Sequence, residues 1–205
     1  MMIKDVLKIA RAEVGVQEVG GNNRGRRVEE YLAAVGLGPG NPWCAAYVAW
    51  VMRQAGVRGW PMTGDTWALE DWAREHGCLH STAQQGDVFL VLGTDGRPVH
   101  TGFVAAVQQD YVSTLEGNTG MRSDFDGDGV AAKSRFSGAN MRYIRWADVL
   151  QPALRVVLNG REIACHPERG DATRCDLRPL AEALGYVVDA QQLDSQGIIT
   201  LRRRT

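Results

Sequence analysis

Cys44, in the segment NPWCAAYVAW at residues 41–50, is a candidate for covalent chemistry. Asn41 is a good helix cap and Pro42 suits a first helical position, so Cys44 is predicted in the first turn of a helix. Unpaired backbone N–H groups there favour a thiolate and supply donors for an oxyanion. The competing interpretation is packing, because a lone cysteine on an apolar helix is usually a core residue.

A thiolate nucleophile needs a general base, and histidine is the usual one. His100 opens the apolar segment VHTGFVAAV at residues 99–107, whereas the other three histidines lie in polar stretches. The next strand-like segment carries Glu116 and Asn118, which share one face of a strand because side chains alternate. Each of these two residues is a candidate to hold the imidazole in position, as the third member of a triad does.

The register of the predicted hairpin decides which of the two meets His100. If Val107 pairs with Tyr111 across a three-residue loop, His100 lies opposite Asn118, and a slip of two residues places it opposite Glu116. An odd register would turn both side chains to the other face of the sheet. The residues alone leave these alternatives open.

The elements that must position these side chains indicate an α+β fold. Helical patterns occupy the first part of the chain, and strand-like runs then suggest an antiparallel sheet. A boundary near residues 151–152 predicts a domain at 1–150 and a small α+β module at 154–205. The predicted helices cover residues 1–15, 26–37, 42–56 and 66–77, and the predicted strands cover 86–92, 99–107, 111–117 and 141–146.

The strings NPWCAAYVAW, VHTGFV and LEGN, in that order, resemble the CHAP family of cysteine, histidine-dependent amidohydrolases/peptidases. The stretch GVQEVGGNNRGRRVEEYLAAVGL is similar to phage-type and prophage-type members, so the resemblance spans about residues 1 to 148. The related NlpC/P60 group fits less well, because its cysteine usually follows an Asp in a DCSG-like string.

The resemblance implies a papain-like α+β fold and cleavage of peptidoglycan, as an N-acetylmuramoyl-L-alanine amidase or as a peptidoglycan endopeptidase. It implies that Cys44 is the nucleophile, His100 the base, Glu116 the acid that orients His100, and Asn118 the polar residue that follows. No metal or organic cofactor is expected. Two alternatives remain open: a non-catalytic wall-binding or virion structural protein with a hydrolase-derived domain, and a thiol hydrolase of a non-wall amide.

Substrate-binding candidates lie close to the nucleophile. Trp43 is the best candidate for a sugar-stacking ring in a groove, and Asn23 and Arg24 are candidates to line the cleft. A separate motif places Asp124, Asp126 and Asp128 at alternate positions, like the start of a calcium loop. Its twelfth position is Arg135, where a calcium loop needs a glutamate, so a turn near the rim of the site is the preferred interpretation.

The C-terminal module resembles the small stalk-like domain at the N-terminus of some copper amine oxidases. It departs from that pattern in the loop between Cys165 and Cys175, which either form a local disulfide or are two free thiols. A wall-binding or partner-docking role for this module follows by analogy only.

Net charge and the length of the apolar runs limit the classes of partner that this protein can have. A net charge of −1 argues against a nucleic-acid binder, and no apolar run is long enough for a membrane span. Charges at Lys4, Asp5 and Lys8 interrupt the N-terminal apolar pattern, so no secretory signal peptide is expected. Action on the wall after release or after phage-like delivery is the resulting expectation, with peptidoglycan as the partner and the oligomeric state unknown.

Overall fold

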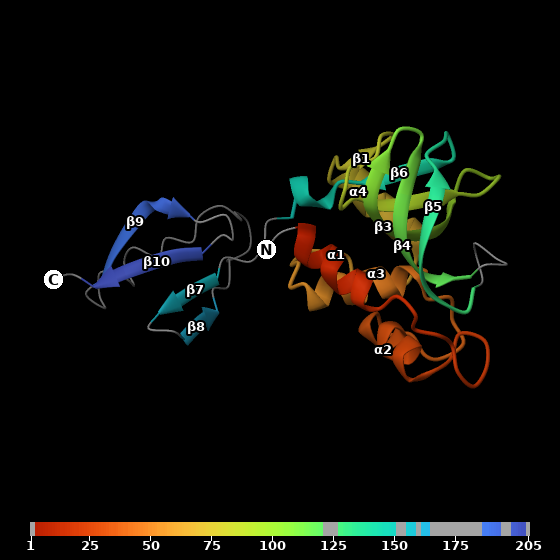
Figure 1. The fold of residues 1–205 in the computed structure, drawn as a ribbon, viewed down its shortest axis with the longest axis horizontal. Coiled ribbons are helices and arrows are strands. Elements are labelled where there is room, and N and C mark those ends of the chain that lie inside the picture. Colours follow the sequence, from red (N-terminus) through yellow and green to blue (C-terminus); the bar gives the residue numbers. More distant parts are fainter. Residues whose placement is uncertain are drawn as a thin grey trace. The chain divides into compact units, whose positions relative to one another are not determined.

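The structure, a computed structural model, describes residues 3–120 and 127–150 with their side chains. Beyond residue 150 it describes only the backbone of four strands, at 155–158, 161–164, 186–193 and 198–203. The chain divides into two compact units, Ile3–Leu150 and Gln151–Thr205 (Figure 1).

The four predicted helices are all present in the first unit. Each has the buried face that its apolar pattern indicates, and α3 is buried from Cys44 through Met52. The side chain of Asp65 caps α4 by accepting the backbone N–H of Trp67 at 2.9 Å. The helices are α1 (Ile3–Ala12), α2 (Arg26–Ala34), α3 (Cys44–Gln54) and α4 (Thr66–Glu75).

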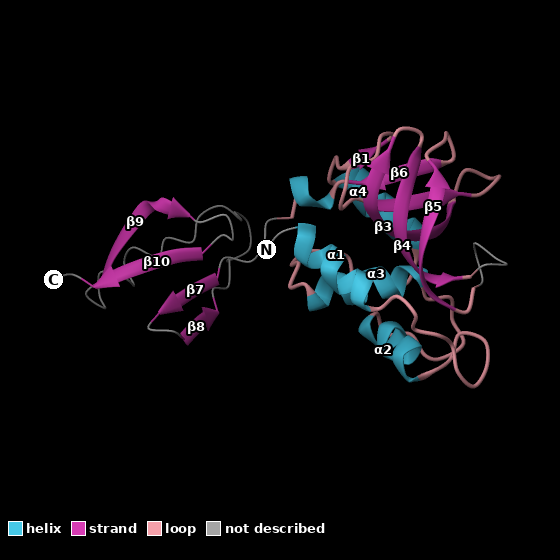
Figure 2. Ribbon diagram, in the orientation of Figure 1, coloured by secondary structure: helices cyan, strands magenta, loops and turns pink. Residues whose placement is uncertain are grey.

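An antiparallel sheet of six strands follows the helices, in the order β1-β6-β2-β3-β4-β5, and a short 3-10 helix, η1 (Trp146–Asp148), comes after it (Figure 2). The α+β class is confirmed, as are the four predicted strands. Two further strands, β1 and β5, were not predicted. The strands are β1 (Leu79–His80), β2 (Val88–Leu92), β3 (Pro98–Gln108), β4 (Tyr111–Thr119), β5 (Gly129–Phe136) and β6 (Met141–Ile144).

Helix α3 packs directly on strands β3 and β4, and this contact brings the two halves of the candidate site together. Gly117 on β4 permits the close approach. A Cβ atom at this position would lie 2.7 Å from ring or Cβ atoms of Trp43 and Tyr47, which is closer than such contacts occur. The glycine therefore lets the start of α3 lie against the strand that carries Glu116.

A buried carboxylate holds the helical half together. Glu13, 8% exposed, follows α1 and accepts two hydrogen bonds from Arg27 of α2, both at 2.7 Å. The hydroxyl of Tyr31 donates to the same carboxylate at 2.5 Å. Although burial raises the pKa of Glu13, the bonds from Arg27 and Tyr31 outweigh that effect and lower it. Glu13 therefore stays ionised and paired at neutral pH.

Tyr31→Phe is expected to lower the free energy of unfolding by roughly 1–2 kcal/mol, since it removes a buried hydrogen bond to a charged group and leaves the ring in place. Urea denaturation of the two proteins measures the difference. Tyr111→Phe is the matched control, because the side chain of Tyr111 is 52% exposed and its loss should change little. Equal stability of wild type and Tyr31→Phe would contradict the expectation.

The second unit contains a four-stranded sheet in the order β8-β7-β10-β9. Strand β10 pairs in parallel with β7 and antiparallel with β9. The segment DLRPLAEALG at residues 176–185, whose apolar pattern predicts a helix, and the loop between Cys165 and Cys175 lie outside the described residues. The strands are β7 (Arg155–Leu158), β8 (Arg161–Ala164), β9 (Tyr186–Leu193) and β10 (Ile198–Arg203).

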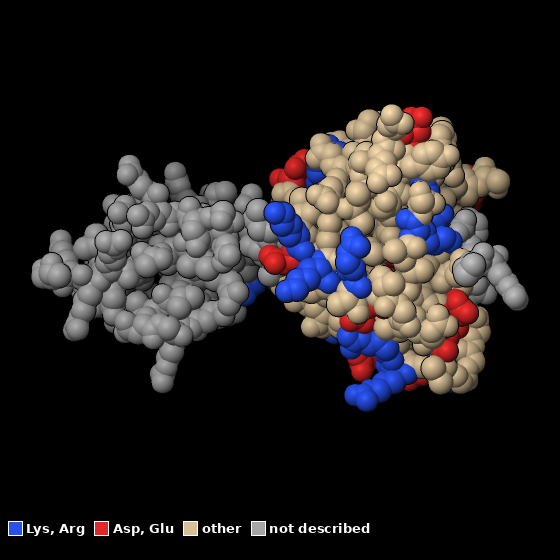
Figure 3. All heavy atoms as spheres, in the orientation of Figure 1, with Lys and Arg blue, Asp and Glu red and all other residues tan. Residues whose placement is uncertain are grey.

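Among the described residues, no helix is both long and apolar enough to cross a bilayer. Acidic and basic side chains are mixed on the face of the first unit that Figure 3 shows, in keeping with the net charge of −1.

Candidate active site

Cys44 is the first residue of α3 and is 7% exposed. The first helical hydrogen bond runs from Tyr47 N–H to the carbonyl of Trp43 at 2.8 Å. The N–H groups of Cys44 and the two alanines after it therefore precede that bond, as the donors at a helix start do. The Cys44 side chain therefore lies at the positive end of the helix dipole.

The predicted cap of this helix was wrong. Trp43, not Asn41, is the N-cap residue of α3, and it makes no side-chain cap hydrogen bond. The Asn41 amide instead donates to the carbonyl of Gly38 at 2.9 Å, within the preceding loop. The helix consequently begins at Cys44, two residues later than a start at Pro42 would place it.

Trp43 holds the residue before the nucleophile in a fixed place. Its indole N–H donates to Glu18 Oε1 at 2.8 Å, and its ring stacks on Tyr31 with centroids 5.5 Å apart. The side chain is 0% exposed. The expected role of Trp43 as a sugar-stacking ring does not fit this environment, since no face of the indole reaches solvent.

The β3–β4 hairpin departs from the predicted loop and still delivers one of the predicted registers. Gln108 pairs with Tyr111 across a two-residue turn, in which Gln109 has a φ of 46°. An irregularity between Val104 and Ala106 then shifts the register by one residue, so that Phe103 pairs with Leu115. Phe103 and Leu115 thus pair in the even register that was predicted to bring His100 and Glu116 together, and β4 becomes irregular beyond this point, between Glu116 and Thr119.

The structure brings Cys44, His100 and Glu116 into one row. His100 Nε2 lies 3.0 Å from Glu116 Oε2, and both side chains are 0% exposed. The thiol of Cys44 is close enough to the same imidazole to raise its pKa. Glu116, and not Asn118, is therefore the residue that contacts His100 Nε2.

The charge state of His100 follows from these contacts. Burial by itself lowers the pKa of the imidazole, but the hydrogen bonds to Cys44 and Glu116 raise it to about 9. The ordinary value is 6.5. A raised pKa stabilises the folded protein fully below the unfolded value and loses that contribution as the pH rises through the folded value.

We therefore expect His100 to remain protonated through neutral pH and to titrate near pH 9. Its contribution to stability should be complete below about pH 6.5 and lost between there and pH 9. NMR titration of the labelled imidazole measures the first effect. Urea unfolding of wild type and His100→Gln across this pH window measures the second, and a wild-type ring that titrates at its ordinary value would contradict both.

Arg135 is a site residue that the sequence did not reveal. Its Nε donates to Glu116 Oε1 and its Nη2 to Glu116 Oε2, each at 2.6 Å. The hydroxyl of Thr114 donates to Oε1 at 2.5 Å. Burial raises the pKa of Glu116, but the bonds from Arg135 and His100 outweigh this and lower it to about 2. Glu116 is thus an ionised carboxylate in a buried position.

Arg135 was missed because its strand was missed. The segment GVAAKSRF of β5 holds few strand-forming side chains, and it alternates between half-buried and exposed residues along most of its length. In the sequence, Arg135 stood out only as the twelfth position of a calcium-like loop, and its pairing with Glu116 gives a physical reason for a cation there. Asp124 and Asp126 lie outside the described residues. The backbone carbonyl of Asp128 accepts the N–H of Glu18 at 2.7 Å.

The remaining candidates surround the row without joining it. Asn118 is 1% exposed with a φ of 54°, and its amide group has no hydrogen-bond partner among the described residues. Asn23 is 4% exposed, and its backbone N–H donates to Glu18 Oε2 at 2.8 Å. Arg24 is exposed on the same loop. Glu18 therefore links the loop that carries Asn23 to Trp43, the residue before the nucleophile.

Residues 36–118 of the chain match the CHAP domain family, and this segment contains Cys44, His100, Glu116 and Asn118. No curated protein matches the chain. Among solved structures, the crystal structure of Ly7917 matches with 18% identity and a TM-score of 0.42, over 70% of this chain and 62% of that chain. A structure of Ly7917 with the hydrolyzing product of MDP matches with 19% identity and a TM-score of 0.41, over the same shares.

Proposed function

We propose that this protein is a peptidoglycan hydrolase that cleaves an amide bond of the bacterial cell wall with Cys44 as the nucleophile. The observation that carries the proposal is the row of Cys44, His100 and Glu116, which come from α3, β3 and β4. All three residues lie inside the segment that matches the CHAP domain. A buried thiol beside a buried, carboxylate-bound imidazole is the arrangement that nucleophilic acyl transfer requires.

In the acylation step, the thiolate of Cys44 attacks the amide carbonyl carbon and forms a carbon–sulfur bond. The carbonyl oxygen becomes an oxyanion, for which the backbone N–H groups at the start of α3 are suitable donors. Protonated His100 donates its proton to the amide nitrogen, the carbon–nitrogen bond breaks, and the amine leaves. The product is a thioester on Cys44 and a neutral imidazole.

In the deacylation step, His100 accepts a proton from water as the water attacks the thioester carbonyl. The carbon–sulfur bond breaks and restores the thiolate and the imidazolium, and the substrate leaves as a carboxylic acid that then loses its proton to solvent. Glu116 accepts the N–H of His100 throughout and holds the ring in one orientation. Both steps use only side chains and backbone groups of this chain.

The decisive experiment is mass spectrometry of purified peptidoglycan after digestion by the wild type and by Cys44→Ala. Stem peptides freed from glycan at the lactyl–alanine bond, by the wild type alone, would define an N-acetylmuramoyl-L-alanine amidase. Cuts within the peptides, by the wild type alone, would define an endopeptidase. Binding to walls from several bacteria without release of any fragment would reject the proposal in favour of a wall-binding protein.

A further inference from the structure

The carboxylate that holds His100 is itself held on its other side by Arg135. Two parallel charge-assisted hydrogen bonds of 2.6 Å occupy both oxygens of Glu116, and the bond to His100 uses one of the same oxygens. A bidentate pair of this kind fixes the plane of the carboxylate as well as its position. The side chain of Arg135 is 11% exposed and that of Glu116 is 0% exposed, so water screens the pair little.

We propose that Arg135 is a positioning residue of the active site, which keeps Glu116 ionised and aims its Oε2 atom at His100. This role concerns the same site and rests on the proposed function. Arg135 lies outside the segment at residues 36–118 that matches the CHAP domain, because β5 follows that segment in the chain. The guanidinium acts on the imidazole through the carboxylate and does not itself contact Cys44 in any described interaction.

The physical reason is the balance of charge in a buried site. In the ion-pair state, Cys44 is a thiolate and His100 is an imidazolium. With Arg135 present, the four charges of the site then alternate in sign: thiolate, imidazolium, carboxylate and guanidinium. The thiol and imidazole state is also neutral overall, as is the thioester intermediate, because Glu116 and Arg135 cancel in each. Without Arg135, the ion-pair state would carry one uncompensated negative charge away from water, and a buried carboxylate in that position takes up a proton.

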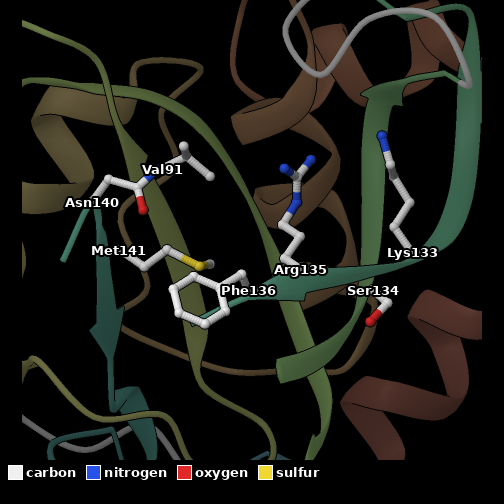
Figure 4. A pocket seen from close by; sticks show the side chains of 7 residues that line it. All are labelled: Val91, Lys133, Ser134, Arg135, Phe136, Asn140 and Met141. Atoms are coloured by element: carbon white, nitrogen blue, oxygen red, sulfur yellow. The ribbon is translucent and has the colours of Figure 1, made fainter. Parts of the chain in front are cut away.

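The polar groups that face Glu116 and His100 come from three elements. Helix α3 provides Cys44 and the phenol of Tyr47, whose pKa burial raises, so that it stays neutral. Strand β4 provides the hydroxyl of Thr114, which is uncharged. On β5, Lys133 extends from the same side of the strand as Arg135 (Figure 4), and its Nζ donates to Gly120 O at 3.1 Å and to Thr119 Oγ1 at 3.3 Å. Among these groups, the two cations that pair with Glu116 are His100 and Arg135.

The principal test compares Arg135→Met and Arg135→Lys with the wild type. Methionine removes the charge at similar length, so Glu116 should take up a proton at a pH about one to three units higher than in the wild type. His100 then loses its acceptor at mildly acidic pH. We expect the acid limb of the pH profile to move upward and kcat to fall on the order of 10²-fold, with KM within about threefold. Lysine keeps the charge without the bidentate geometry and should recover about tenfold of the loss.

Two readouts need no substrate and therefore separate this proposal from the proposed function. The rate at which iodoacetamide alkylates Cys44, followed against pH, reports the fraction of thiolate. NMR titration of the labelled His100 ring reports its proton directly. If the wild type digests no wall, the proposed function fails, while these two measurements still decide the role of Arg135.

Arg145→Met is the matched control. Arg145 pairs with Asp87 at 3.3 Å, and the exposed fractions of the two side chains, 13% and 4%, resemble those of Arg135 and Glu116. The control should lose stability and keep the wild-type pH profile and alkylation rate. If Arg135→Met behaves in the same way, Arg135 is a structural residue only and the proposal is overturned. Should Arg135→Met fail to fold, Arg135→Lys decides by the same criterion.

A pocket next to the guanidinium allows one further test. Arg135 borders a cavity of about 360 Å³ that is also lined by Val91 and Met141 (Figure 4). Arg135→Ala should enlarge this space, and added methylguanidinium should enter it and restore both kcat and the alkylation profile. Tetramethylammonium, which cannot donate hydrogen bonds, should restore neither. An equal effect of the two cations would count against the proposal.

Discussion

Cys44→Ala is expected to abolish amide hydrolysis, with a loss on the order of 10⁴-fold or more, because no other group in the described site can form the thioester. The fold should remain, since the substitution removes one sulfur atom from the first residue of a helix and leaves the Cβ atom in place. Thermal unfolding and turbidity loss of a wall suspension, measured on the same preparation, separate the two effects.

Cys78→Ala provides the matched control for that experiment. Cys78 and Cys44 are both buried free thiols of the described chain. Burial raises the pKa of the Cys78 thiol, which disfavours a thiolate, and its backbone lies at the far end of α4. Cys78→Ala should keep wild-type activity and be alkylated at Cys44 as the wild type is, whereas Cys78 in the Cys44→Ala protein should resist alkylation under the same conditions. Full lysis by Cys44→Ala would rule out the thiol mechanism.

Glu116→Gln is expected to have the second largest effect, and it should affect both activity and stability. The amide cannot accept both the N–H of His100 and the two bonds from Arg135, so the imidazole loses its fixed orientation. A loss of about 10³- to 10⁴-fold in kcat is expected by comparison with triads that lose this acceptor. The guanidinium of Arg135 is also left buried without a counter-charge, which costs about 3–5 kcal/mol of stability.

The acid dependence of stability gives an independent check on Glu116. Its pKa is lowered to about 2 from an ordinary value of 4.5, so its contribution to folding is complete above pH 4.5 and is lost as the pH falls toward 2. Urea unfolding over this range should show the slope in the wild type and a weaker slope in Glu116→Gln. Parallel slopes in the two proteins would show that folding does not lower the pKa of Glu116.

Glu13→Gln is the control for loss of a buried carboxylate as such. Glu13 also binds an arginine through two hydrogen bonds, but that arginine is Arg27, whose side chain is 40% exposed. The control should lose less stability than Glu116→Gln, because solvent screens the cation that is left behind. It should retain catalysis, since Glu13 binds only Arg27 and Tyr31 in the described contacts.

Patterns among neighbouring residues were sufficient to predict the helices and to identify the elements that carry the site residues. The apolar residues of α1 and α3 recur with the period of a buried helix face, and that period is a property of neighbouring residues in the chain. The same holds for the strand alternation from which Glu116 was predicted as one of two candidate partners of His100. The sequence by itself therefore determined the α+β class, the helix that carries Cys44 and the strands that carry His100 and Glu116.

Contacts between distant segments decided the rest. The irregularity between Val104 and Ala106 converts an odd register at the turn into an even one at Phe103 and Leu115, and no pattern of neighbouring residues in the sequence indicates this shift. Trp43 is buried because Glu18 and Tyr31 surround it, and both come from other segments. Arg135 meets Glu116 across 19 residues of chain, on a strand whose own residues barely indicate one. A buried ion pair of this kind depends on which strands become neighbours, which is a property of the tertiary structure and not of any local pattern.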